Sequence, residues 1–134
     1  ITDFAFVPNA LQNMQFCFSV LFFLLLIIQA PAPVIQWLSS TEYDFGDIHY
    51  KQPAHHTFEY KNISETPLVI DNIRPSCGCT AVDWEEAVIE PDSVGLIQVS
   101  YDARAKGYFR KSLKVYFRGQ RRAEKLWLEG NVIE

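Results

Sequence analysis

The tripeptide Cys77-Gly78-Cys79 is the part of the sequence best suited to chemistry. In an extended strand, residues two apart point to the same face, and their Cβ atoms lie about 6.5–7 Å apart. A disulfide needs Cβ atoms about 3.5–4.5 Å apart, so an extended segment cannot form the bond. Gly78 accepts conformations that other residues avoid, so a turn there could bring the two sulfur atoms together. A ring this small is expected to be strained and readily reduced.

Four interpretations of this pair remain open. Cys77 and Cys79 are either two packed thiols at a junction between strand and turn, or a labile disulfide that serves as a redox couple. Alternatively, their thiolates chelate copper(I) or zinc, ions that soft sulfur ligands bind well. In the fourth interpretation, one of them pairs with a thiol of another protein. Cysteine packs as a small hydrophobic residue unless its surroundings make the thiol reactive. The residue type alone therefore does not decide among the four interpretations.

His56 is the candidate for a third metal ligand, or for a base beside the cysteine pair. It alternates in phase with Phe58 and Tyr60, so it should face the core or its rim. The ordinary interpretation is a hydrogen-bonded core histidine. A structural zinc site takes four ligands, and the sequence offers no fourth that stands out. We therefore expect no cofactor, with copper or zinc as the alternative.

A second group of candidates follows from the distribution of charge. The chain has a net charge of −4, so it has no general attraction to nucleic acid. Nine of its 12 basic residues nevertheless lie within 103–125. An alternating strand in this stretch would present several of them on one face, which could attract phosphates or an acidic polysaccharide. The ordinary interpretation is a solvated strand face whose charges discourage edge-to-edge pairing. The binding-surface candidates are Arg110, Lys114, Tyr116 and Arg118.

The chain after Pro33 predicts a β-sheet domain. Short apolar stretches are broken at close intervals by turn residues, a rhythm typical of a sandwich or barrel. Each stretch alternates apolar and polar residues, which is typical of antiparallel sheets that pack face to face. We therefore expect an all-β, immunoglobulin-like antiparallel sandwich of about seven strands over residues 37–134. The predicted strands and strand pieces are 43–48, 55–62, 68–74, 80–84, 88–89, 94–102, 109–118 and 125–133.

An uncharged apolar run, FCFSVLFFLLLII at 16–28, precedes this domain. Its thirteen residues fit a signal-peptide core of about 7–15 better than a transmembrane helix of roughly 20. Ala30-Pro31-Ala32 resembles a cleavage site, whereas a proline directly after it should hinder cleavage. Residues 1–33 are thus expected to be either a signal peptide or an uncleaved membrane anchor, and Met14 is a candidate start of translation. Either outcome places the domain in the periplasm or at the cell surface, where cysteines oxidise.

Six segments, taken together and in order, resemble the DUF1573 family of exported bacterial proteins of unknown function. They are YDFGDI (43–48), HTFEYKN (56–62), PLVIDNIRPSCGCT (67–80), IEPDSVGLIQVSYD (89–102), GYFRKSLKVYF (107–117) and LWLEGNV (126–132). SCGCT is the most specific of these motifs, and the family usually has Pro-Gly where this chain has Pro91-Asp92. The resemblance implies export and a fold similar to the Hydin-type immunoglobulin-like domains. It implies no established activity.

These observations favour a non-enzymatic exported module that binds another macromolecule or spaces components at the cell envelope. The sequence contains no G-x-S-x-G, no H-E-x-x-H and no phosphate-binding loop. The expected partner is an envelope protein or polysaccharide rather than nucleic acid. Membrane contact is expected only through the N-terminal segment, if that segment is not cleaved. The alternative is a thiol redox or soft-metal protein that acts through Cys77 and Cys79.

Overall fold

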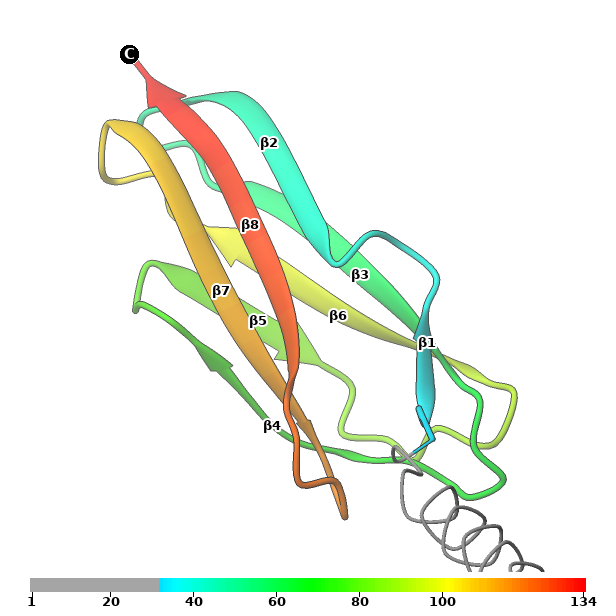
Figure 1. Ribbon diagram of the computed structural model, residues 1–134. Coiled ribbons are helices and arrows are strands. Elements are labelled where there is room, and N and C mark those ends of the chain that lie inside the picture. The colour runs from blue at the N-terminus through cyan, green and yellow to red at the C-terminus, as the bar shows by residue number, and fades with distance from the viewer. Residues whose placement is uncertain (1–31) are drawn as a thin grey trace, which may run out of the picture. The chain divides into compact units, whose positions relative to one another are not determined.

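The computed structural model describes residues 32–134, which form eight strands in two four-stranded sheets (Figure 1). The strands are β1 (Ile35–Trp37), β2 (Glu42–His49), β3 (Ala54–Asn62), β4 (Ile70–Pro75), β5 (Thr80–Trp84), β6 (Val94–Tyr101), β7 (Gly107–Phe117) and β8 (Glu124–Ile133). Sheet A has the strand order β1-β3-β6-β5, and sheet B has the order β2-β8-β7-β4. The all-β sandwich expected from the alternating sequence is therefore confirmed.

The core lies between the sheets and is built from the alternating apolar residues. In β7, for example, Phe109, Leu113, Val115 and Phe117 are buried, while Arg110 and Lys114 are exposed. β6 and β8 alternate in the same way, so each sheet turns one apolar face inward. Burying one large apolar side chain contributes about 1.5–3 kcal/mol, and this packing holds the two layers together.

Three details differ from the sequence prediction. β1 was not expected, because three residues are too short to show an alternating pattern, and the domain consequently begins before Trp37. The predicted piece at 88–89 is only an isolated bridge between Ile89 and Leu68. β2 pairs with β8 in parallel, whereas the other pairings are antiparallel. Alternation specifies which face of a strand is buried, but it does not specify the direction of the neighbouring strand.

Gly130 lies where two strands and an aromatic ring approach closely. A Cβ atom there would lie 3.0 Å from the carbonyl oxygen of Gly46 and 3.0 Å from the Phe109 ring. Gly46 has a φ of +65° and sits in an irregularity of the β2–β8 pairing. A side chain at this position would push these strands apart, which explains why glycine occurs here within a strand.

The fully buried Asn62 fixes the connection between β3 and β4. Its side-chain oxygen accepts hydrogen bonds from the Ser64 amide at 2.9 Å and the Ser64 hydroxyl at 2.7 Å. Its side-chain nitrogen donates to the carbonyl oxygens of Thr66 at 2.8 Å and Ile89 at 2.9 Å. One buried amide thus satisfies two backbone carbonyls and closes the loop, as a buried polar group must.

The apolar run 16–28, Met14 and the sequence Ala30-Pro31 lie outside the described residues. Within residues 32–134 there is no helix with the length and apolar character needed to cross a membrane. The compact unit formed by the described part of the chain runs from Pro33 to Glu134.

Candidate functional site

Cys77 and Cys79 are joined by a disulfide in the turn between β4 and β5. Their Cα atoms lie 5.3 Å apart, a separation common to disulfides in general. The chain leaves the extended conformation at Ser76 and returns to it at Thr80, so Gly78 lies within the turn that such a bond requires. The pair is therefore in the oxidised state that the redox interpretation needs, while the redox role itself stays a prediction.

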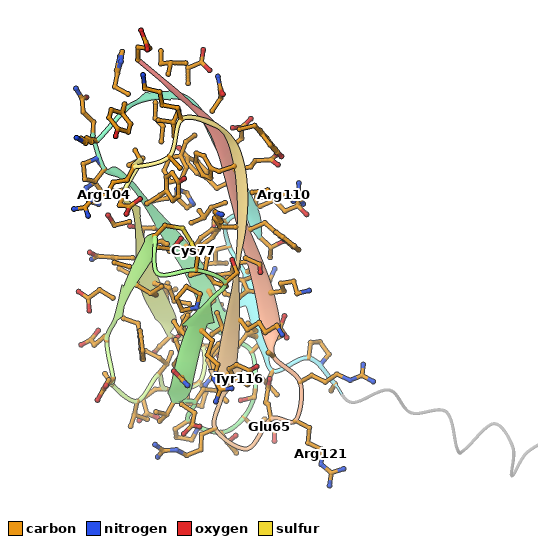
Figure 2. All side chains as sticks on the ribbon, turned by 90° about the vertical axis from the view of Figure 1, so that its left-hand side faces the viewer. Glu65, Cys77, Arg104, Arg110, Tyr116 and Arg121 are labelled. Carbon is orange, nitrogen blue, oxygen red and sulfur yellow. A yellow bond between two sulfur atoms is a disulfide. The ribbon has the colours of Figure 1, made fainter. Side chains whose placement is uncertain are left out.

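The disulfide turn carries the chain from sheet B to sheet A, because β4 and β5 are edge strands of different sheets. On the sheet B side, the Ser76 amide donates to the Ser112 carbonyl at 2.8 Å. On the sheet A side, the Asp102 amide donates to the Cys79 carbonyl at 3.0 Å. Both cysteines are partly exposed, and Figure 2 shows Cys77 on this connection. The backbone of the turn is thus held at both ends by hydrogen bonds to the two sheets.

His56 points between the sheets and makes aromatic contacts. Its ring stacks on Tyr43, with ring centroids 3.6 Å apart, and meets the edge of Phe58 at 4.6 Å. Burial lowers the pKa of His56 below its ordinary value of 6.5. Its buried Nε2 atom has no hydrogen-bond partner among the described protein atoms.

The structure does not bring His56 and the cysteine pair together into a three-ligand metal group. Within residues 32–134 no group of three or more His, Cys, Asp or Glu side chains is placed to hold a metal ion. Two thiolates would be available to copper or zinc only after the Cys77–Cys79 bond is reduced. Metal binding therefore stays a proposal that concerns the reduced protein.

The second candidate site is the outer face of sheet B. Lys114 of β7 lies directly opposite Arg74 of β4 on one side and directly opposite Lys125 of β8 on the other. Side chains in such positions have Cβ atoms about 4.5–5.5 Å apart. All three side chains are exposed, and none of them forms an ion pair with a described residue. We call Arg74, Lys114 and Lys125 the cationic row.

Two partly buried aromatic side chains flank the cationic row. Tyr116 and Trp127 each follow a residue of the row by two positions, so they share its face of the sheet. The Arg74 guanidinium carbon lies 5.2 Å from the centroid of the Tyr116 ring, and Lys125 Nζ lies 5.3 Å from that of Trp127. These distances allow cation–π attraction, which holds the two cations over the rings. The cationic row together with Tyr116 and Trp127 is called the cationic face.

The other two binding candidates from the sequence are paired with carboxylates. Arg110 forms ion pairs with Glu129 at 2.8 Å and with Glu42 at 3.3 Å. Arg118 lies beyond the end of β7, and its Nε is 3.8 Å from a carboxylate oxygen of Asp71. Of the four binding candidates, only Lys114 and Tyr116 therefore belong to the cationic face.

Three residues of the cationic face were not singled out from the sequence: Arg74, Lys125 and Trp127. Lys125 and Trp127 could have been found, because they alternate with the buried Leu126 and Leu128 near the end of the basic stretch. No local signal places Arg74 beside Lys114, since their pairing depends on the register of two strands far apart in the sequence.

Comparisons with known proteins support the fold. Residues 36–132 match the family model described as a protein of unknown function (DUF1573). A protein of unknown function from Porphyromonas gingivalis W83 is 14% identical with a TM-score of 0.63, over 73% of this chain and 46% of its own. The ASH/PapD-like domain 7 of human CEP192 is 10% identical with a TM-score of 0.66, over 100% and 97% of the two chains.

A third similar structure, the VesB protease of Vibrio cholerae, is 10% identical with a TM-score of 0.59, over 75% of this chain and 32% of its own. The chain thus spans about half the length of the Porphyromonas protein and a smaller share of the protease. No curated protein matches the chain. At these identities the likeness concerns the fold alone.

Proposed function

The chain belongs to the DUF1573 family, and we propose that it is a non-enzymatic exported module that binds another macromolecule at the cell envelope. The observation that carries this proposal is the cationic face on sheet B. Three neighbouring cations lie in register across three strands, and none of them forms an ion pair with a described residue. Like charges directly opposite each other destabilise a sheet, so an external anionic partner would relieve a cost built into the fold.

Protection against aggregation explains this face less well. Charges that prevent edge-to-edge pairing belong on edge strands. Lys114 and Lys125 instead lie on β7 and β8, the two interior strands of sheet B. Their side chains therefore occupy the middle of the outer face of sheet B rather than its margin. The middle of the sheet is where we expect a binding surface.

Two features support export. The uncharged run at 16–28 has the length of a signal-peptide core. The Cys77–Cys79 disulfide is a bond that persists in oxidising compartments and is rare in the cytosol. Both features support our proposal that the binding module acts in the periplasm or at the cell surface.

Photo-crosslinking in living cells tests the binding role. A photoreactive amino acid replaces Ser112, which lies opposite Trp127 and two residues before Lys114, on the same face of the sheet. The matched control replaces Thr57, an exposed residue of β3 in sheet A. We expect a specific adduct with an envelope macromolecule at Ser112 and none at Thr57. Absence of an adduct at both sites, or equal adducts at both, would contradict the proposal.

The alternative is a thiol redox function, which the observed disulfide favours over the other interpretations of the cysteines. A thiolate of a partner dithiol would attack one sulfur of the Cys77–Cys79 bond, which breaks as a mixed disulfide forms. The second partner thiol would then release the partner as a disulfide. Two electrons and two protons would pass to Cys77 and Cys79, which become thiols.

Thiol titration and peptide mass analysis of the chain, purified without reductant, test this alternative. The peptide that carries residues 77–79 should be lighter by two hydrogens than after mild reduction. Its bond should exchange rapidly with a dithiol protein. Free thiols at Cys77 and Cys79 in the isolated protein would contradict the redox function. Uptake of one equivalent of copper(I) or zinc by the reduced chain, lost in Cys77→Ser, would support the soft-metal form of the alternative.

A further inference from the structure

We propose that the partner of the cationic face is an acidic protein segment, rich in Asp and Glu. This inference rests on the proposed binding function and names the partner class. Arg74, Lys114 and Lys125 follow one another at the spacing of adjacent strands, about 4.7–4.9 Å. Carboxylates on the same side of an extended segment recur about every 6.5–7 Å, so two of them can lie over the row together.

The residue types of the cationic face favour a protein partner. Trp, Tyr and Arg are the side chains that most often dominate the binding energy of protein interfaces. All three types occur here within one small surface, as Trp127, Tyr116 and Arg74. The Arg74 guanidinium can also bind a carboxylate through two parallel hydrogen bonds, which a lysine ammonium cannot do.

The placement of the rings argues against a sugar or nucleotide partner. Arg74 lies over the Tyr116 ring and Lys125 lies over the Trp127 ring. The rings thus hold the cations in place instead of offering free faces on which a sugar or base could stack. Cations held in this way lose less conformational freedom when a carboxylate binds, which favours affinity.

The charges around the face reinforce its selectivity. Arg110, on the same face, is already paired with Glu42 and Glu129, whereas the three cations of the row form no ion pair with a described residue. A short acidic segment therefore fits the site better than a long uniform polyanion. Such an interface is expected to associate faster at low salt and to weaken as salt is added.

Binding of a fluorescent peptide to the full-length chain in non-ionic detergent tests the inference. The probe is a dodecapeptide of Glu and Ser, and its counterpart carries Lys in place of Glu. We expect the acidic probe alone to bind, and Lys114→Glu to weaken its binding at least tenfold. Lys125→Gln, which removes one charge without reversing it, should weaken binding about threefold.

Arg104→Glu is the matched control, because it makes the same change in net charge as Lys114→Glu. Arg104 precedes the start of β7, whereas Tyr116 is near its end, and Figure 2 shows these two residues well separated along the domain. Tyr116 lies eight positions after Tyr108, the second residue of β7, and this stretch of strand is about 26 Å long. Binding by Arg104→Glu should stay within twofold of the unaltered chain, and an equal loss in both variants would overturn the inference.

Other anionic probes distinguish the remaining partner classes. Tighter binding of polygalacturonate at equal carboxylate concentration would overturn the inference in favour of an acidic polysaccharide. Preferential binding to vesicles containing phosphatidylglycerol would overturn it in favour of a membrane surface. If no anionic probe binds while the Ser112 crosslink still forms, the acidic partner is wrong and the binding function stands. If no anionic probe binds and the Ser112 crosslink does not form either, the binding function is contradicted as well.

Discussion

Lys114 and Lys125 lie directly opposite each other across the ladder that joins the two interior strands of sheet B. Arg74 continues the row on the far side of Lys114. None of the three side chains forms an ion pair with a carboxylate among residues 32–134, and two of them lie over the rings of Tyr116 and Trp127. A substitution that removes positive charge from the row should therefore raise the stability of the domain and weaken the proposed binding.

Lys114→Glu should make the domain more stable while it abolishes binding of the acidic probe. The new carboxylate would attract both Arg74 and Lys125, and each opposite-charge pair across strands contributes about 0.2–1 kcal/mol. We expect the free energy of unfolding in urea to rise by about 0.5–1 kcal/mol at low salt, with the gain reduced at high salt. Arg104→Glu should show no such gain. A destabilised Lys114→Glu variant would contradict the described charge environment.

Asn62→Asp should destabilise the domain strongly, although the two side chains have nearly the same shape. The carboxylate cannot donate the hydrogen bonds that Asn62 gives to Thr66 and Ile89, and it would place a buried charge against two carbonyl oxygens. We expect the free energy of unfolding to fall by about 2–4 kcal/mol at neutral pH. Asn72→Asp, on the outer face of sheet B opposite Tyr116, is the matched control and should change stability little. Equal effects of the two substitutions would count against the buried network.

The stability of the domain should fall as the pH drops below about 6.5, in part because of His56. Burial lowers the pKa of this residue in the folded state, so near pH 6 the unfolded chain binds more protons than the folded chain. Stability then decreases from pH 6.5 down to the lowered folded-state pKa, below which His56 contributes no further change. Above this window the residue is neutral in both states.

Comparison with His56→Phe isolates this contribution from that of the carboxylates. Phenylalanine can keep the stack on Tyr43 and the contact with Phe58 without titrating. We expect the difference in unfolding free energy between the two proteins to vary with pH only below about 6.5, measured by urea unfolding between pH 5 and 8. A constant difference across this range would mean that His56 titrates alike in the folded and unfolded chains.

Local patterns in the sequence predicted most of the fold, because burial of one strand face is a local property. In β7, the buried Phe109, Leu113 and Val115 occupy the positions that alternation assigned to the core. A disulfide between cysteines two residues apart was expected to need a turn at Gly78, and the structure has both the bond and the turn. His56 was expected to face the core or its rim, and it lies partly buried in phase with Phe58, although its Nε2 atom lacks the hydrogen bond of the ordinary interpretation.

What could not be predicted depends on contacts between distant segments. The partner of His56 is Tyr43, which belongs to the other sheet. The neutralisation of Arg110 requires Glu42 and Glu129 from two further strands, and the row through Lys114 requires the registers of β4 and β8. Strand order and register depend on the packing of the whole domain. The sequence therefore indicated a basic strip, but it did not indicate which of its cations form ion pairs with carboxylates and which do not.

Genetic complementation tests most directly whether the cationic face or the disulfide carries the function. A strain that lacks the gene receives either the double variant Lys114→Glu with Lys125→Glu, or the double variant Cys77→Ser with Cys79→Ser, with equal protein levels and thermal unfolding checked for both. We predict that the cysteine variant restores the phenotype of the intact gene and that the lysine variant does not. Restoration by the lysine variant together with failure of the cysteine variant would contradict the binding function and establish the thiols as the functional groups.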